Sequence, residues 1–171
     1  MASTQTWSEG NGTNAGTETT SRAEANWKNV DDSTTAYSSS PITAGNNSFS
    51  KYQAIKYAGT FNSLSALTYK VSTNAPGTGL SVVAAVITAA TPATPTTTAT
   101  GDSAASTTGT SANFVHTNTW SSVFAAGSAT GGPNDATSWY GQAYRTQLQT
   151  TGSAAPGDIT SVTITATWTE S

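Results

Sequence analysis

The sequence predicts an all-β fold, a jelly-roll-like antiparallel β-sandwich with an extended polar N-terminal arm. Several short stretches alternate apolar and polar residues, which is the pattern of a strand with one buried face. Clusters of Gly, Pro, Asn and Asp separate these stretches and predict turns. About seven or eight short strands joined by such turns are typical of a sandwich or a jelly roll.

The composition predicts a small core. Thr and Ser make up 58 of the 171 residues, while Leu, Ile, Val and Phe together make up only 21. Ordinary globular chains contain about 20% or more of these four apolar residues. Much of the core must therefore come from the 15 aromatic residues, because each buries about 150–250 Å². We expect contacts with other chains to add to the stability.

Residues 1–45 are the predicted arm, since they are polar and poor in aliphatic side chains. Isolated aromatic residues in such a segment favour anchors that dock on another surface. A strand and loop wrapped around the same domain is the alternative, and the sequence leaves both open. The capping-box pattern of residues 21–24 predicts one short helical turn at most. The candidate intermolecular anchors are Trp7, Trp27, Tyr37 and Ile42.

Residues 46–171 are the predicted β-sandwich domain. Apolar and polar residues alternate in FSKYQAIKYAG, SALTYKVST, SWYGQAYRTQLQT and ITSVTITATWTE, each of which predicts a half-buried strand. The β-branched run LSVVAAVIT follows the turn NAPGTG and predicts a buried strand, although its length would also fit a helix. The core candidates are Ile55, Tyr57, Leu67, Tyr69, Val71, Val83, Tyr140, Tyr144, Val162, Ile164 and Trp168.

Between these strands, residues 91–112 form a low-complexity Thr/Ala/Pro/Ser stretch that predicts an extended loop. ANFVHTNTW then predicts a further strand. SSVFAAG fits a short helix or an edge strand equally well, and GSATGGPNDATS predicts a turn region.

Few residues of the chain suit catalysis. The chain has no Cys, and its one histidine, His116, sits in a predicted strand without a G-x-S-x-G motif elsewhere. A glycosidase needs two carboxylates facing each other, but nearly all nine carboxylates fall in predicted loops, turns or termini, where solvation explains them. Asp31 and Asp32 lack the spacing of a calcium-binding loop. We expect no enzyme, with no catalytic, metal-binding or cofactor-binding residues.

Charge and hydropathy also exclude two classes of partner. The formal net charge is −3, and the six Lys and Arg residues are scattered, so no positive patch for nucleic acid is predicted. The longest apolar stretch, residues 80–90, is far shorter than the ~20 residues that span a bilayer. The opening MASTQTWSEG has no signal-peptide pattern. We expect neither nucleic acid nor a membrane as a partner.

Three stretches together resemble small β-rich virion structural proteins of tailed bacteriophages, including the head decoration or cement proteins of cyanobacterial phages. They are residues 26–73 (from NWKNVDDSTTAYSSSPITAG to TYKVST), residues 140–158 (YGQAYRTQLQTTGSAAPGD) and the closing ITSVTITATWTE. The resemblance covers about two-thirds of the chain and rests on patterns of a β-scaffold.

The resemblance implies a capsid decoration protein on the outer surface of an icosahedral head. Such a protein is made in the host cytoplasm, is often a homotrimer, and clamps neighbouring capsomers by binding the major capsid protein. Extended arms suit this role, because several weak contacts made together multiply modest affinities. The alternative is a tail-fibre or receptor-binding β-domain that recognises host glycans through exposed aromatic residues.

Overall fold

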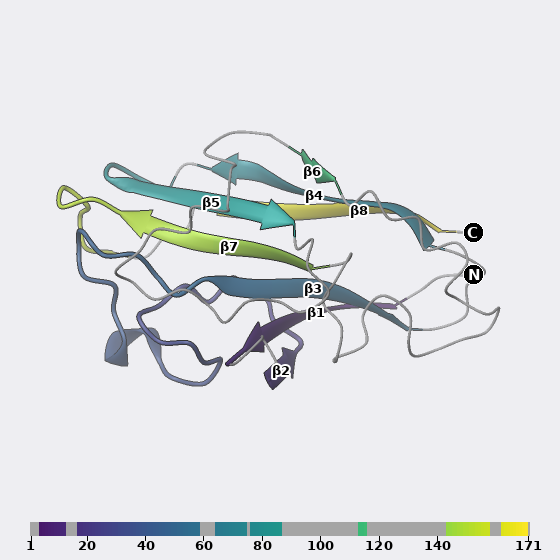
Figure 1. Cartoon of the computed structure of the whole chain (residues 1–171), viewed down its shortest axis with the longest axis horizontal. Helices are drawn as coiled ribbons and strands as arrows, with labels where there is room; N and C mark the ends of the chain where they lie inside the picture. The colour runs from purple at the N-terminus through teal and green to yellow at the C-terminus, as the bar shows by residue number, and fades with distance from the viewer. Residues whose placement is uncertain are drawn as a thin grey trace.

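The computed structural model describes residues 4–12, 17–58, 64–74, 76–86, 113–115, 143–157 and 162–170. Within this part the chain forms eight strands and one short 3-10 turn (Figure 1), so the all-β prediction is confirmed. The strands are β1 (Thr4–Asn11), β2 (Thr17–Thr20), β3 (Lys51–Ala58), β4 (Leu64–Asn74), β5 (Leu80–Val86), β6 (Asn113–Val115), β7 (Ala143–Thr150) and β8 (Val162–Glu170). The turn is η2 (Tyr37–Ser39).

The strands form two sheets in which every described pairing is antiparallel. One sheet has five strands in the order β2-β1-β3-β7-β5, and the other has three in the order β6-β4-β8. In Figure 1, β1, β3, β7 and β5 follow one another from bottom to top, with β6 at the top of the view and β8 at the level of β5. From β4 onward, each strand belongs to the sheet that does not contain the strand before it.

Strand β8 shows why the alternating sequences become strands. Its residues alternate between half-buried and exposed along the whole strand. The exposed positions 163, 165, 167 and 169 are all Thr, which is β-branched and polar and therefore suits the solvent-facing side of a strand.

Strands β3, β7 and β5 of the five-stranded sheet are buried on both faces. Tyr52 on β3 and Val83 on β5 lie on one face and are 1% and 2% exposed. Ile55 and Tyr144 lie on the opposite face and are each 1% exposed. Only a layer of other residues over each face can produce this burial, so these strands form the interior of the protein.

The predicted core residues divide into three groups in the structure. Ile55, Val83 and Tyr144 are buried, whereas Val162, Ile164 and Trp168 on β8 are half-buried. The side chains of Tyr57, Leu67, Tyr69 and Val71, the whole of Tyr140, and the predicted loop at 91–112 with His116 lie outside the described residues.

Part of the segment expected as an arm belongs to the sheet. Strand β1 pairs along its length with β3, with Trp7 opposite Ile55, and its other edge pairs with β2. The segment that follows, residues 21–50, is called the N-terminal segment below. Its one helical turn is η2 and residues 21–24 are not helical.

The N-terminal segment covers one face of the five-stranded sheet. The Gln53 side chain on β3 donates a hydrogen bond to the carbonyl of Glu24 (3.3 Å), and the Trp27 indole donates to the Thr146 hydroxyl on β7 (3.0 Å). Just before β3 begins, the Ser48 amide donates to the carbonyl of Leu148 (2.8 Å), so the segment runs on beside β7. The chain therefore enters β3 already attached to the face that it covers.

Candidate functional site

A row of polar side chains lies on the face of β1 and β3 that the N-terminal segment covers. Glu9 on β1 is opposite Gln53 on β3. Side chains two residues apart on a strand point to the same face, so Asn11 lies beside Glu9 and Lys51 beside Gln53. Glu9 and Lys51 are both fully buried, at 0% exposed. Buried charges are rarely tolerated unless they are paired, so their partners explain their presence.

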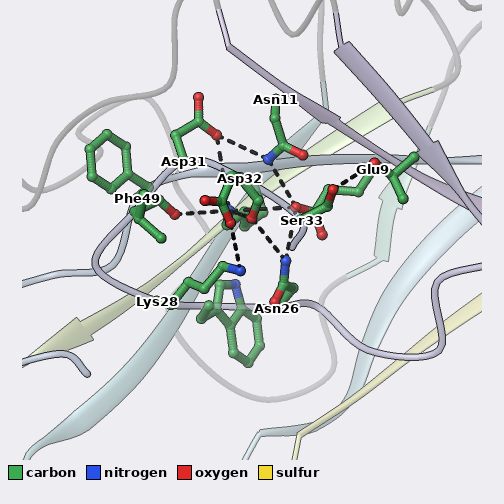
Figure 2. A network of polar contacts seen from close by, with 12 residues as sticks. Glu9, Asn11, Asn26, Lys28, Asp31, Asp32, Ser33 and Phe49 are labelled. Atoms are coloured by element: carbon green, nitrogen blue, oxygen red, sulfur yellow. Dashed lines mark hydrogen bonds and ion pairs between the residues drawn. The ribbon is translucent and has the colours of Figure 1, made fainter. Parts of the chain in front are cut away.

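Six charged side chains pair with one another at this place and are called the ionic cluster below. Its members are Glu9, Arg22, Lys28, Asp31, Asp32 and Lys51. Three of them are acidic and three are basic, so the cluster has no formal net charge. It also contains three of the six basic residues of the chain. Glu9, Lys28, Asp31 and Asp32 are labelled in Figure 2, where Asn11 points to Asp31 and Lys28 points to Asp32.

Lys51 occupies the centre of the ionic cluster. Its Nζ lies 3.4 Å from Glu9 Oε1 and 3.9 Å from Asp31 Oδ1. It also donates hydrogen bonds of 3.3 Å to the carbonyl oxygens of Val30 and Asp32. Burial lowers the pKa of Lys51, and the charges of Glu9 and Asp31 oppose this shift. The ammonium thus holds together carboxylate and carbonyl oxygens that a bound cation would hold in other proteins.

Asp32 organises the turn at the outer side of the ionic cluster. Its Oδ1 accepts hydrogen bonds from the amides of Thr34 (3.1 Å) and Thr35 (2.9 Å), and its Oδ2 accepts one from the Thr35 hydroxyl. Lys28 Nζ lies 2.9 Å from Oδ1 and donates to the Thr35 carbonyl at 2.6 Å. The Thr35 hydroxyl, followed by Lys28, holds the pKa of Asp32 well below its usual range.

Two asparagines join the acidic groups. Asn11 Nδ2 donates to Glu9 Oε1 (2.9 Å) and to Asp31 Oδ1 (3.0 Å), while Asn26 Nδ2 donates to Glu9 Oε1 (3.2 Å) and to the Asp32 carbonyl (3.1 Å). Figure 2 shows both amides directed at these oxygens. Asn26 has a positive φ of 55°, a conformation that Asn adopts more readily than most residues. Glu9 Oε2 and Asn11 Oδ1 are buried and accept no hydrogen bond.

A groove of about 1290 Å³ lies beside the ionic cluster. Its walls come from the N-terminal segment, from the covered face of the five-stranded sheet, and from Val162 and Ile164 on β8. Trp7 and Tyr144 meet edge-to-face in one wall, with ring centroids 6.0 Å apart and an interplanar angle of 85°. The Trp27 indole is fixed by its hydrogen bond to Thr146.

All four residues expected as intermolecular anchors border this groove. Trp7, Trp27 and Ile42 are half-buried, whereas Tyr37 in η2 is 42% exposed. Partial burial and the nearby Glu24 carboxylate raise the pKa of Tyr37 to about 12. Its hydroxyl is therefore neutral at physiological pH and can donate a hydrogen bond at the rim of the groove.

The ionic cluster does not resemble a metal centre. Within the described ranges, no group of three or more His, Cys, Asp or Glu residues is arranged to hold a metal ion. Each carboxylate of the cluster instead faces a Lys or Arg side chain. This arrangement fixes a loop to a sheet.

Sequence reasoning missed the ionic cluster because it assigned the carboxylates to solvated loops. That assignment is wrong for Glu9, which is fully buried, and for Asp31, whose side chain is 14% exposed. The one local signal is spacing. Glu9 and Asn11 are two residues apart, as are Lys51 and Gln53, so each pair would lie on one face of a strand. Nothing local indicates that these two segments pair.

Comparison of the chain with protein-family models, with curated proteins and with solved structures finds no match in any of the three. Among the described residues, no helix is long and apolar enough to cross a membrane.

Proposed function

We propose that the two sheets form a jelly-roll-like β-sandwich. Two features support this architecture. Consecutive strands from β3 to β8 alternate between the sheets, and in a sandwich such connections cross from one layer to the other. Residues of both sheets, including Tyr144 and Ile164, also border the same groove. A crystal structure in which β4 and β8 pack face to face on the five-stranded sheet would verify the architecture, and a side-by-side arrangement would contradict it.

We propose that the protein is a non-enzymatic virion structural protein that decorates the outer surface of a phage head. The observation that carries this proposal is the use of charge in the described residues. The ionic cluster is internally neutralised and attaches the N-terminal segment to the sheet, so its charged groups build a rigid scaffold. The exposed side of β8 is a row of uncharged Thr side chains. A stiff, weakly charged β-scaffold suits a protein that remains on a capsid under changing ionic conditions.

In this proposal the partner is the major capsid protein, and the bound form is a homotrimer. The groove is the contact surface that we assign to the partner, because its rim carries the exposed aromatic ring of Tyr37. Exposed aromatic residues beside half-buried ones are common at the energetic centres of protein interfaces.

The direct test compares particles with and without the protein. Particles that lack it should assemble but break at a lower temperature or in low salt. Adding the purified protein back should restore stability, whereas the Tyr37→Ala variant should bind more weakly. Ser39→Ala is the matched control, since Ser39 is exposed in the same turn. Equal robustness of particles with and without the protein would contradict the proposal.

The aromatic lining of the groove also favours a second candidate, a tail-fibre or receptor-binding domain for host glycans. Trp27 and Tyr37 flank polar side chains such as Gln53 and Asn26, and sugars bind to aromatic rings flanked by hydrogen-bonding groups. A glycan array probed with the protein and with Trp27→Ala separates the two candidates. Binding that Trp27→Ala abolishes, together with few copies per particle, would favour the receptor-binding role over decoration.

A further inference from the structure

The ionic cluster contains an amine, a carboxylate and a carboxamide in an arrangement that none of the roles above requires. The register of β1 and β3 places Gly10 opposite Tyr52, so Asn11 and Lys51 follow as the next facing positions. Side chains at facing positions of antiparallel strands start about 4.5–5.5 Å apart at Cβ. The Asn11 carboxamide and the Lys51 amine therefore extend from neighbouring points on one face.

Glu9 links these two groups through a single oxygen atom. Its Oε1 accepts the hydrogen bond from Asn11 Nδ2 at 2.9 Å and lies 3.4 Å from Lys51 Nζ. One carboxylate oxygen is thus within reach of an amine that can act as a nucleophile and of the nitrogen that an attack on the carboxamide would expel. A general acid–base needs this proximity to both reacting groups.

The surroundings favour reaction at this place. Lys51 and Glu9 are fully buried and Asn11 is 4% exposed, so water competes poorly as a nucleophile. Burial also lowers the pKa of Lys51, which increases the fraction of the neutral, reactive amine. The two hydrogen bonds from Asn11 Nδ2 to Glu9 and Asp31 fix the carboxamide in place, while Asn11 Oδ1 accepts no hydrogen bond.

We propose that Lys51 and Asn11 form an intramolecular isopeptide bond, with Glu9 as the proton carrier. The bond joins Lys51 Nζ to Asn11 Cγ and links strands β1 and β3 covalently. This inference is independent of the virion role, because it concerns the folded chain alone.

The reaction balances without any oxidant or cofactor. Glu9 takes a proton from the Lys51 ammonium, and the neutral Nζ adds to Asn11 Cγ to give a tetrahedral carbon. Glu9 then donates its proton to Nδ2 and accepts one from Nζ, while the Cγ–Nδ2 bond breaks and ammonia leaves. The ammonia takes the proton from Glu9 as ammonium. One lysine ammonium and one carboxamide thus give one amide and one ammonium ion.

The cross-link closes the chain from residue 11 to residue 51 into a ring. A covalent ring restricts the unfolded chain and so favours the folded state. It also keeps β1 attached at the position where the N-terminal segment departs from the sheet. We therefore expect β1 to remain paired with β3 under conditions that separate uncross-linked strands.

The decisive measurement is the intact mass of the purified full-length chain under denaturing conditions. We expect a mass lower than that of the sequence by one ammonia. Cleavage by trypsin should stop at Lys51, so that residues 29–56 appear as a branched peptide joined to the peptide that ends at Arg22. Fragmentation should locate the branch at Asn11 and Lys51. A mass equal to that of the sequence, or a branch at Asp31 or Asn26, would overturn the proposal.

Three variants test the assigned roles. Lys51→Arg keeps a cation beside Glu9 but removes the nucleophile, and Asn11→Ala removes the acceptor, so both should retain the full mass. Glu9→Gln keeps the shape but cannot carry the proton, and we expect the loss of ammonia to be abolished or at least tenfold slower. Lys28→Arg is the matched control and should still lose ammonia, because Lys28 pairs with Asp32. Unchanged loss of ammonia in Glu9→Gln would overturn the role of Glu9.

Discussion

The face shared by β1 and β3 and the outer side of β8 are both polar, but they differ in charge and in burial. On β1 and β3 the polar groups are ionic, buried and paired with one another. On β8 the outward positions are all Thr, and the side chains are exposed and uncharged. In these two places, charged groups fix segments of the chain to one another and hydroxyl groups face the solvent.

This difference explains how a chain with few aliphatic residues holds its sheets together. Among the described residues, few large apolar side chains are buried, and Ile55, Tyr144 and Leu148 are examples. The ionic cluster adds directional contacts between β1, β3 and the N-terminal segment. Such contacts stabilise little in net terms but penalise any arrangement that leaves one partner unpaired. The buried face should therefore be sensitive to substitution and the exposed face tolerant.

The largest expected effect comes from Glu9→Ala. This variant removes the nearest carboxylate of Lys51 and leaves the ammonium buried. Loss of one partner of a buried pair costs about 3–5 kcal/mol, and the free energy of unfolding should fall by this amount in urea denaturation. The loss is also expected if the wild-type chain carries the proposed cross-link, because Glu9→Ala cannot form that bond and Lys51 then remains a buried ammonium. A decrease below about 1 kcal/mol would show that the ionic cluster is not needed for stability.

A smaller effect is expected where the turn before β5 lies against the turn after β7, joined by the hydrogen bond from the Thr151 amide to the Gly79 carbonyl (2.8 Å). Gly79 has a φ of +73°, and a Cβ placed there would lie 2.7 Å from the backbone nitrogen of Ala154. Left-handed backbone alone costs a residue other than Gly about 1–2 kcal/mol, so Gly79→Ala should lower the free energy of unfolding by at least that. Gly152→Ala in the turn after β7 is the control, because a Cβ there meets nothing within 4 Å. Equal effects of the two substitutions would contradict the prediction.

The next effect depends on pH and concerns Asp32. Its pKa is lower in the folded chain than in the unfolded chain, so between these values the unfolded chain binds more protons. The stabilisation is therefore complete above about pH 4 and is lost as the pH falls toward the lowered pKa. The melting temperature of the wild-type protein should decrease over this acid range, and that of Asp32→Asn should decrease less. Parallel acid profiles for the two proteins would contradict this origin.

The smallest effect is expected on β8. Thr165→Ala removes a hydroxyl from an exposed position, and substitutions of this kind usually change stability by less than about 0.5 kcal/mol. Urea denaturation of Thr165→Ala and Glu9→Ala, measured in parallel, gives the free energy of unfolding for a substitution on the exposed face and for one on the buried face. A cost at Thr165 above about 1.5 kcal/mol would mean that the exposed face of β8 is covered by something else.

The sequence was informative where alternation involved apolar residues. This alternation predicts the segments of β3, β4, β7 and β8, and the β-branched run predicts β5. The sequence does not distinguish β1 from a docking arm, because the covered face of β1 carries Glu9 and Asn11 beside Trp7 and the apolar alternation is missing. The pairing of Glu9 with Lys51 depends on strand register, which no local pattern contains. The same holds for the groove, whose walls come from segments far apart in the sequence.

The position of β7 has a consequence for how the protein is made. This strand lies between β3 and β5, with Tyr52 facing Arg145 and Val83 facing Gln147. During synthesis β3 and β5 emerge from the ribosome well before β7, and each then lacks the neighbour that its free edge requires. The three-stranded sheet likewise waits for β8 to pair with β4. Folding should therefore complete late and in one step, since pairings between distant segments are slow to form.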